Sequence, residues 1–209
     1  MYNQGFVLYQ TTLNKNTHTL KMVVHDFAVA YLDGTFVGSF DRATSTEHTY
    51  NVTCANSECK LWILVEAMGH INFDHQMEAD RKGLVSFSDS RSTKFVWDIY
   101  KINVDQKILS WRGFSDKGYP SLSRAIFNVS SVGDTFINVK NYKKGYVWVN
   151  GRNLGRYWNI GPSQKVFCPG VWLKPGQNDL FVLDLLTDEM PELTGDKTLK
   201  GWFTDYVSL

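Results

Sequence analysis

Two hairpin turns of the same kind constrain the fold of this chain more than any other feature. Alternating apolar and small residues lead into Asp33-Gly34, and a similar run leads into Asn150-Gly151. In both copies a bulky apolar residue and a glycine follow three and four positions after the turn glycine. Such dipeptides between alternating runs predict a type I′ hairpin, because that turn needs positive φ at both central residues. We therefore expect two copies of one β-rich unit.

The pattern of apolar runs predicts an all-β chain. No segment keeps a 3.6-residue period over ten residues, and turn signals recur every 8 to 12 residues, which is typical of a β-sandwich or jelly roll. We expect the polar stretch 14–19 to end the first strand, and residues 95–104 to form a closing strand anchored by Trp97 and Tyr100. The expected strands are 5–13, 20–24, 28–32, 36–40, 50–53, 60–66, 83–87, 95–104, 125–129, 135–139, 146–149, 166–167 and 180–185.

Length and charge limit the domain number and the partners. A chain of 209 residues is long enough for two domains of about 100 residues. We place the first β-sandwich at 1–104, a linker rich in charges, Gly and Pro at 105–120, and the second β-sandwich at 121–209. A net charge of +1 argues against nucleic acid as a partner. No apolar run is long enough for a membrane helix, and residues 1–20 are too polar for a signal peptide, so a signal would lie upstream.

Cysteines and glycosylation sequons point to the secretory route. Cys54 and Cys59 flank a polar turn and form the expected disulfide, which leaves Cys168 as a buried free thiol. Asn51-Val52-Thr53 and Asn128-Val129-Ser130 both satisfy the Asn-X-Ser/Thr rule, so Asn51 and Asn128 are the expected glycosylation sites. We expect a secreted or lysosomal protein. No metal site is expected, because no His lies at zinc-type spacing from the cysteines, and no cofactor is expected either.

Residues 151–178 (GRNLGRYWNIGPSQKVFCPGVWLKPGQN) resemble the C-terminal region of β-galactosidases of glycoside hydrolase family 35. Residues 5–13 (GFVLYQTTL), His25-Asp26, Asp33-Gly34 with Gly38, and residues 64–72 (LVEAMGHIN) are similar to the preceding β-domain of that family, in the same order. The resemblance covers nearly the whole chain. It implies two tandem β-sandwich or jelly-roll domains of galactose-binding-like topology, which in the family follow a TIM-barrel catalytic domain.

The same resemblance implies that this chain by itself is not an enzyme. Retaining glycosidases need two carboxylates about 5 Å apart, and in this family both sit at the ends of barrel strands. No segment here resembles that barrel, so no catalytic residue is assigned. The acidic residues of the chain are interpreted as solvated or turn-capping groups: Glu66, Asp33, Asp74 and Glu78.

A departure from the family draws attention to the loop that begins at Gly69. Where family members usually read Gly-Arg-Ile/Val-Asn-Tyr, with the Tyr reaching toward the galactose pocket of the barrel, this chain has His70 for the Arg and Phe73 for the Tyr. A Phe keeps a ring for stacking but loses the hydroxyl. Stacking on a sugar requires an aromatic face and flanking polar groups. The candidate carbohydrate-binding residues are Phe73, His70, Asn72 and Asp74 in this loop, and Trp158, Tyr157, Arg156 and Asn153 after the second hairpin.

Three functions remain open from the sequence. The first is a non-catalytic β-sandwich region of a β-galactosidase-like protein, which packs against a catalytic barrel and contacts galactose-type carbohydrate. The second is a free-standing lectin-like module. The third, and least favoured, is an independent hydrolase. Calcium stays open as well: no Asp-x-Asp-x-Asp loop is present, and a site of backbone carbonyls leaves no sequence signal.

Overall fold

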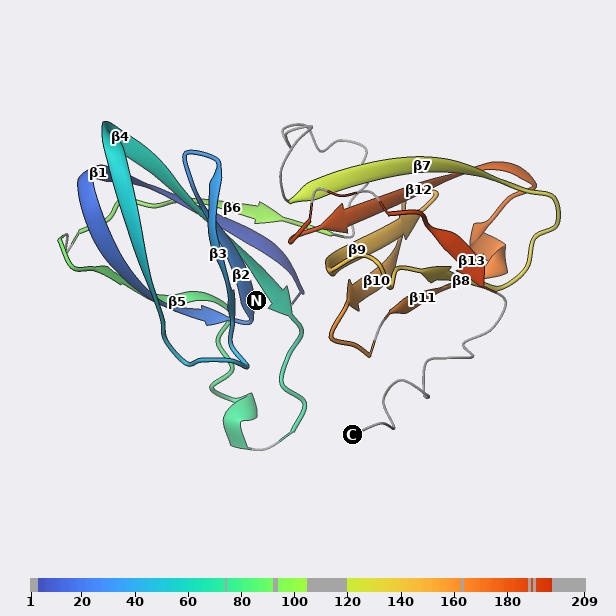
Figure 1. Cartoon of the computed structure of the whole chain (residues 1–209). Helices are drawn as coiled ribbons and strands as arrows, with labels where there is room; N and C mark the ends of the chain where they lie inside the picture. Colours follow the sequence, from blue (N-terminus) through green and yellow to red (C-terminus); the bar gives the residue numbers. More distant parts are fainter. Residues whose placement is uncertain are drawn as a thin grey trace. The chain divides into compact units, whose positions relative to one another are not determined.

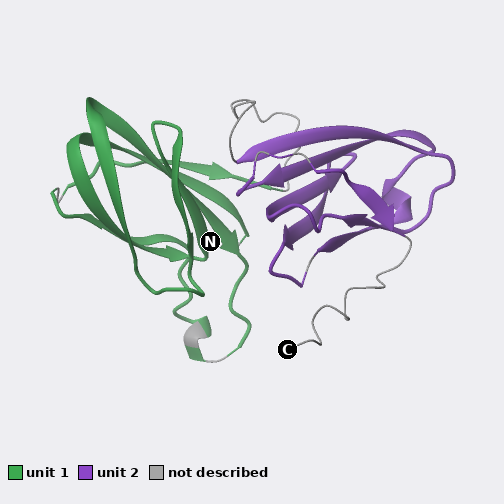
Figure 2. Cartoon of the chain, viewed as in Figure 1, with its two compact units in different colours: residues 1–104 green, residues 105–209 purple. Residues whose placement is uncertain are grey.

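The computed structural model describes residues 4–73, 75–91, 94–104, 120–162, 164–187, 189 and 191–196. The chain divides into two compact units, residues 1–104 and 105–209 (Figure 2). The predicted linker 105–120 lies outside the described residues except for residue 120. Within the described ranges the helices are 3-10 helices of three residues, and none is long or apolar enough to cross a membrane.

Unit 1 is one antiparallel sheet with the strand order β3-β2-β4-β1-β5, to which β6 is added along β1 (Figure 1). The two long strands β1 and β4 run side by side over most of their length. One end of β1 also pairs with β6, and the other end also pairs with β5. The elements are β1 (Gln4–His25), β2 (Phe27–Leu32), β3 (Thr35–Asp41), β4 (His48–Met68), η1 (His75–Met77), β5 (Gly83–Asp89) and β6 (Asp98–Ile102).

The lengths of β1 and β4 correct the sequence prediction. The polar stretch 14–19 does not end the first strand, because it continues as a ribbon paired with the first half of β4, from Asn16 opposite Cys54 to Thr19 opposite Asn51. Most side chains of this ribbon are exposed. A ladder of backbone hydrogen bonds satisfies such a segment whatever the polarity of its side chains, so polarity alone does not mark the end of a strand.

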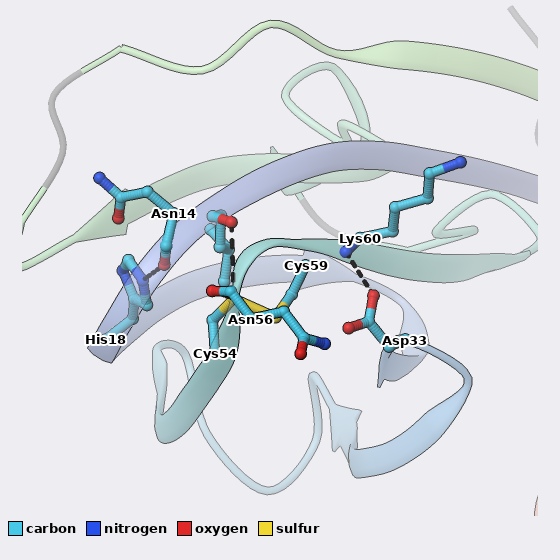
Figure 3. The surroundings of a disulfide bond; sticks show 8 residues. Asn14, His18, Asp33, Cys54, Asn56, Cys59 and Lys60 are labelled. Atoms are coloured by element: carbon cyan, nitrogen blue, oxygen red, sulfur yellow. Dashed lines mark hydrogen bonds between the residues drawn. A yellow bond between two sulfur atoms is a disulfide. The ribbon is translucent and has the colours of Figure 1, made fainter.

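The Cys54–Cys59 disulfide is present, as predicted (Figure 3). It does not close a hairpin turn, because β4 runs through both cysteines. The register of β1 and β4 shifts here, so that Asn14 pairs with Glu58 and Asn16 pairs with Cys54. The disulfide therefore clamps a bulge within a long strand. Cys168 is free and buried, as expected.

The core of unit 1 is apolar and comes from alternate residues of several strands. Leu13, Leu20, Phe40, Leu61 and Ile63 are nearly or fully buried in it. Trp97 packs against this core as predicted. Tyr100 is not a core anchor, contrary to the prediction, because it lies on the short edge strand β6 with 51% of its surface exposed. The predicted strand 95–104 is thus confined to Asp98–Ile102.

Unit 2 has a four-stranded sheet of order β10-β9-β12-β7 and a three-stranded sheet of order β11-β8-β13. Residues from both sheets form its core, including Val147 and Val149 on β9, Val182 on β12, Ile137 on β8 and Val166 on β11. The elements are β7 (Ser121–Val129), β8 (Thr135–Asn138), β9 (Lys144–Val149), β10 (Arg152–Trp158), β11 (Lys165–Cys168), η3 (Gly170–Trp172), β12 (Gly176–Asp184) and β13 (Thr194–Asp196). The chain is all-β, with two sheet-built units, as the sequence predicted.

Both predicted hairpins are present. Asp33 and Gly34 join β2 to β3 with φ values of 48° and 81°, and Asn150 and Gly151 join β9 to β10 with φ values of 50° and 77°. Positive φ at both central residues is the signature of the type I′ turn. In the first hairpin the Asp33 carboxylate also accepts a hydrogen bond from the Lys60 N–H at 2.7 Å (Figure 3). This bond ties the turn to β4.

Candidate functional site

The loop between β4 and β5, residues 69–82, is held at its base by four charged side chains. Two carboxylates, Asp26 and Asp80, alternate with two cations, Arg42 and Lys82. Arg42 Nη1 donates to Asp26 Oδ1 at 2.9 Å and to Asp80 Oδ1 at 3.2 Å. Lys82 Nζ donates to Asp26 Oδ2 at 2.8 Å and lies 3.2 Å from Asp80 Oδ2. This ionic quartet balances its charge, and the side chains of Asp80, Lys82 and Asp26 are at most 7% exposed.

Two backbone N–H groups, one at the end of β4 and one in the loop, complete the quartet. The N–H of Met68 donates to Asp26 Oδ2 at 2.8 Å, and the N–H of Ile71 donates to Asp80 Oδ2 at 2.9 Å. At the other end of the loop, His25 Nδ1 bonds to the carbonyl oxygen of Arg81 at 2.8 Å. Buried charges are costly unless they are paired and hydrogen-bonded. The loop is therefore anchored at both ends by groups that need one another.

The surroundings of Asp80 set its protonation. Burial alone would raise the pKa of this carboxyl, but the N–H of Ile71 and the cations Lys82 and Arg42 outweigh it and lower the pKa to about 2. The ordinary value is 3.8. The Asp80 carboxylate therefore stays charged at neutral and at lysosomal pH.

Acid should weaken the loop anchor only at very low pH. Because the pKa of Asp80 is lower in the folded chain than in the unfolded chain, its stabilising contribution is complete above about pH 4 and is lost as the pH falls toward 2. The shift corresponds to about 2 kcal/mol of unfolding free energy. Urea unfolding between pH 6 and 2 should show this extra loss in the wild type but not in Asp80→Asn. Parallel curves for the two proteins would contradict the assignment.

The quartet leaves the tip of the loop open to solvent. Phe73 is 81% exposed, which is unusual for a Phe in a segment whose ends are so firmly bonded. Asn72 is exposed, and the side chain of His70 is 39% exposed, with its Nδ1 bonded to the carbonyl oxygen of Ile71 at 2.7 Å. Asp74 lies outside the described residues. Three of the four loop candidates thus share one exposed stretch of chain.

Sequence reasoning missed the quartet itself. Only Asp26 was noted there, as part of a motif, and its partners lie far from it in the chain. A signal was present, because Asp26 interrupts a long apolar stretch that runs from Met22 to Leu32, and a buried carboxylate demands cationic partners. Nothing in the sequence shows that those partners are Arg42 and Lys82.

The candidates in unit 2 are dispersed rather than gathered into one site. Tyr157 is 1% exposed, and its hydroxyl donates to Leu183 O or to Asp184 Oδ2, each at 2.9 Å, so its ring is a core element with no face for a sugar. Trp158 is half-buried beneath Lys144, whose Nζ lies 4.0 Å from the ring centroid. Asn153 and Arg156 are half-buried, and the Asn153 side chain accepts the N–H of Gly155 at 2.8 Å.

A hollow of about 590 Å³ in unit 2 lies elsewhere. It is lined by apolar side chains such as Phe127, Leu173 and Leu180, with Arg124 and Glu192 among its polar residues. None of the four unit 2 candidates lines it. The hollow therefore adds nothing to the predicted carbohydrate group on β10.

The acidic residues outside the quartet differ in burial and in hydrogen bonding. Asp33 caps the hairpin region, as expected, and Glu78 is exposed. Glu66 is fully buried within β4, so its interpretation as a solvated group is wrong. It belongs to a central strand that is covered on both faces, where even a polar side chain is withdrawn from water.

Comparisons with known proteins agree with the architecture. A family model described as "Beta-galactosidase, first all-beta domain" matches residues 1–103, and one described as "Beta-galactosidase, galactose-binding domain" matches residues 120–178. Human beta-galactosidase-1-like protein 3 is 32% identical over 190 residues, which cover 86% of this chain and 28% of that protein. Its mouse counterpart is 34% identical over 209 residues, which cover 90% of this chain and 31% of that protein. The chain thus spans less than a third of these curated relatives.

Solved structures give a weaker comparison. An α-L-rhamnosidase of Streptomyces avermitilis, complexed with L-rhamnose, aligns with a TM-score of 0.33 and 12% identity, covering 88% of this chain and 22% of that chain. A TM-score this low supports no conclusion about fold or ligand.

Proposed function

Because the chain belongs to the β-galactosidases of glycoside hydrolase family 35 and corresponds to their accessory β-domains, we propose that it is a non-catalytic region that packs against a catalytic barrel. The loop 69–82 is the proposed contact. The observation that carries this proposal is the exposed ring of Phe73 on a loop whose base is locked by the buried ionic quartet. An exposed aromatic side chain on a loop with a fixed base is a typical binding anchor.

We also propose contact with galactose-type carbohydrate at the tip of this loop. Phe73 supplies an aromatic face, while Asn72 and His70 supply neighbouring polar groups for sugar hydroxyls. Asp74 stays part of the proposed site. On β10, Trp158, Arg156 and Asn153 stay a second proposed surface, now without Tyr157, whose burial removes it.

The domain layout and the location of the protein are proposals as well. The layout is a β-sandwich at 1–104, a linker at 105–120 and a β-sandwich at 121–209, and the division into two compact units supports it. A secreted or lysosomal location is supported by the Cys54–Cys59 disulfide, which is typical of oxidising compartments. The sequon residues Asn51 and Asn128 are exposed, as glycosylation requires.

Replacing Phe73 by Ala tests the docking proposal. We expect wild-type chain to bind the isolated catalytic barrel of a β-galactosidase, and Phe73→Ala to raise the dissociation constant about 30-fold, the effect of losing an interface anchor worth about 2 kcal/mol. Surface plasmon resonance would measure it.

The matched control is Val171→Ala, which removes another strongly exposed apolar side chain, in unit 2. It should bind the barrel as the wild type does. Equal affinities for Phe73→Ala and wild type would rule out the loop as the contact. Tight galactose binding by the chain alone, at submicromolar concentration, would instead favour the lectin-like alternative.

A further inference from the structure

A histidine and an aspartate are buried together in unit 1, at the end of β5 that is remote from loop 69–82. The side chain of His18, on β1, is 1% exposed, and that of Asp89, the last residue of β5, is completely buried. His18 Nδ1 lies 2.7 Å from Asp89 Oδ2. His18 Nε2 lies 2.8 Å from the backbone carbonyl oxygen of Asn14 (Figure 3). Neither the ionic quartet nor the proposed loop contact uses these residues.

Both ring nitrogens of His18 face hydrogen-bond acceptors. A backbone carbonyl oxygen accepts and does not donate, and the same holds for a carboxylate. A neutral imidazole carries a proton on one nitrogen only, so in either tautomer the other nitrogen would point its lone pair at an oxygen within 2.8 Å. The imidazolium form donates from both nitrogens and satisfies both oxygens. The geometry therefore fits the imidazolium and neither neutral tautomer.

The carboxylate of Asp89 needs the same positive charge. Among the residues that the structure describes, His18 is the one basic group paired with it. Its other oxygen, Oδ1, accepts the hydroxyl of Ser90 at 3.4 Å. A buried carboxylate is costly without a cation and is tolerated when it is paired and hydrogen-bonded. Each member of the pair thus favours the charged form of the other.

The remaining surroundings of His18 supply no further charge to its ring. Val52 of β4 lies opposite His18, and the neighbours on the same face of β4 are Tyr50, which can titrate, and Cys54, which is in the disulfide. Because Nε2 faces a carbonyl oxygen and not a nucleophile, the pair is not a catalytic dyad. The charged side chains of the neighbouring segments are exposed: Lys15, Lys21, Glu47, Glu58 and Arg91.

We propose that folded unit 1 holds His18 as an imidazolium, in a buried ion pair with Asp89 that acts as an acid-favoured clasp between β1 and β5. The clasp joins the end of β5 to Asn14, which lies at the register shift of β1. Directly after β5 the N–H of Ser90 donates to the carbonyl oxygen of Thr19 at 3.1 Å. Loss of the second proton leaves either the carboxylate without its cation or the Asn14 carbonyl without its donor.

The clasp should hold unit 1 more firmly in acid than in alkali. The two bonds exist only in the folded chain, so folding favours the doubly protonated ring. The folded chain then binds more protons than the unfolded chain, and its stability falls as the pH rises through the loss of that proton. This direction is opposite to that of Asp80, whose contribution is lost as the pH falls toward 2.

Nitrogen NMR of the imidazole rings tests the proposal on the wild-type chain. The full chain is labelled with nitrogen-15, and correlations between ring nitrogens and ring protons report which nitrogens are protonated. We expect His18 to keep a proton on both nitrogens across the pH range in which the exposed ring of His75 loses its second proton. A neutral tautomer of His18 at a pH where His75 is already neutral would overturn the proposal.

Asp89→Asn separates the clasp from a merely structural role. An amide at position 89 can donate to Nδ1 while a neutral ring donates from Nε2 to Asn14, so both bonds survive without the second proton. We expect the protection factor of the Ser90 N–H in hydrogen exchange to fall at least about 10-fold in the wild type between about pH 5 and pH 9, after correction for the intrinsic exchange rate. In Asp89→Asn it should stay nearly constant.

The matched control is Glu58→Gln, which removes an exposed carboxylate from the strand opposite Asn14. It should keep the pH dependence of the wild type. If Asp89→Asn keeps it as well, the pair is not its source and the clasp is ruled out. If Asp89→Asn fails to fold, the ring spectrum of the wild type decides alone. None of these measurements involves a barrel or a sugar, so their outcome leaves the proposals for Phe73 unaffected.

Discussion

Replacing Asp26 by Ala should lower the free energy of unfolding of the chain by about 3–5 kcal/mol, the usual cost of removing one partner from a buried set of charges. Asp26 accepts hydrogen bonds from Arg42, from Lys82 and from the N–H of Met68. Without it, Lys82 is left with a side chain only 6% exposed and one carboxylate where it had two. Urea unfolding followed by tryptophan fluorescence would measure the loss.

The control for this prediction is Glu78→Gln, which also removes a carboxylate from unit 1 but at an exposed position on the same loop. It should change the stability by less than about 0.5 kcal/mol. Native-state hydrogen exchange should show the loop backbone 69–82 losing protection in Asp26→Ala and keeping it in Glu78→Gln. If the two variants lose equal stability, the quartet does not anchor the loop, and the basis for a preformed Phe73 contact disappears.

Replacing Gly145 by Ala should destabilise unit 2 by about 3 kcal/mol, because the added Cβ overpacks against backbone. Gly145 lies on β9 opposite Asp184 of β12. A Cβ there would lie 1.7 Å from the carbonyl oxygen of Leu183 and 3.0 Å from the hydroxyl of Tyr157. Neither group can move without breaking the hydrogen bond that joins them. Thermal unfolding by circular dichroism would report the loss as a lower melting temperature.

Gly133→Ala is the matched control in the same unit. A Cβ at Gly133 meets nothing within 4 Å, and its backbone φ is not positive. It should leave the melting temperature within about 2 °C of the wild type, since a harmless surface change costs only tenths of a kcal/mol. A drop in Gly133→Ala as large as that in Gly145→Ala would show that loss of glycine flexibility, rather than the clash with β12, causes the effect.

Local patterns in the sequence predicted much of the fold. The type I′ turns at Asp33-Gly34 and Asn150-Gly151 follow from two adjacent residues each, because positive φ restricts the residue choice so strongly. The Cys54–Cys59 pairing follows from a short separation in the chain. The prediction failed where β1 and β4 continue as a polar ribbon, since their strand state there comes from mutual pairing and not from burial of side chains.

The candidate site was only half predicted. Phe73, His70 and Asn72 were found because the loop departs from its family at two positions, and the structure leaves all three accessible to solvent to different degrees. The choice of Tyr157 as a candidate was wrong, because its side chain is buried. The alternation of side chains along a strand shows that the neighbouring rings of Tyr157 and Trp158 face opposite sides, but it does not show which of them faces the core.

The sequence by itself determined that this chain is all-β, that it carries two I′ hairpins and one short-range disulfide, and that it resembles the β-domains of a β-galactosidase. Each of these rests on residues close together in the chain. Only the tertiary structure decided that Asp26, Arg42, Asp80 and Lys82 meet beneath the Phe73 loop. The physical reason is that burying a charge makes a partner necessary without specifying which one. The choice of partner depends on strand pairing across the whole of unit 1.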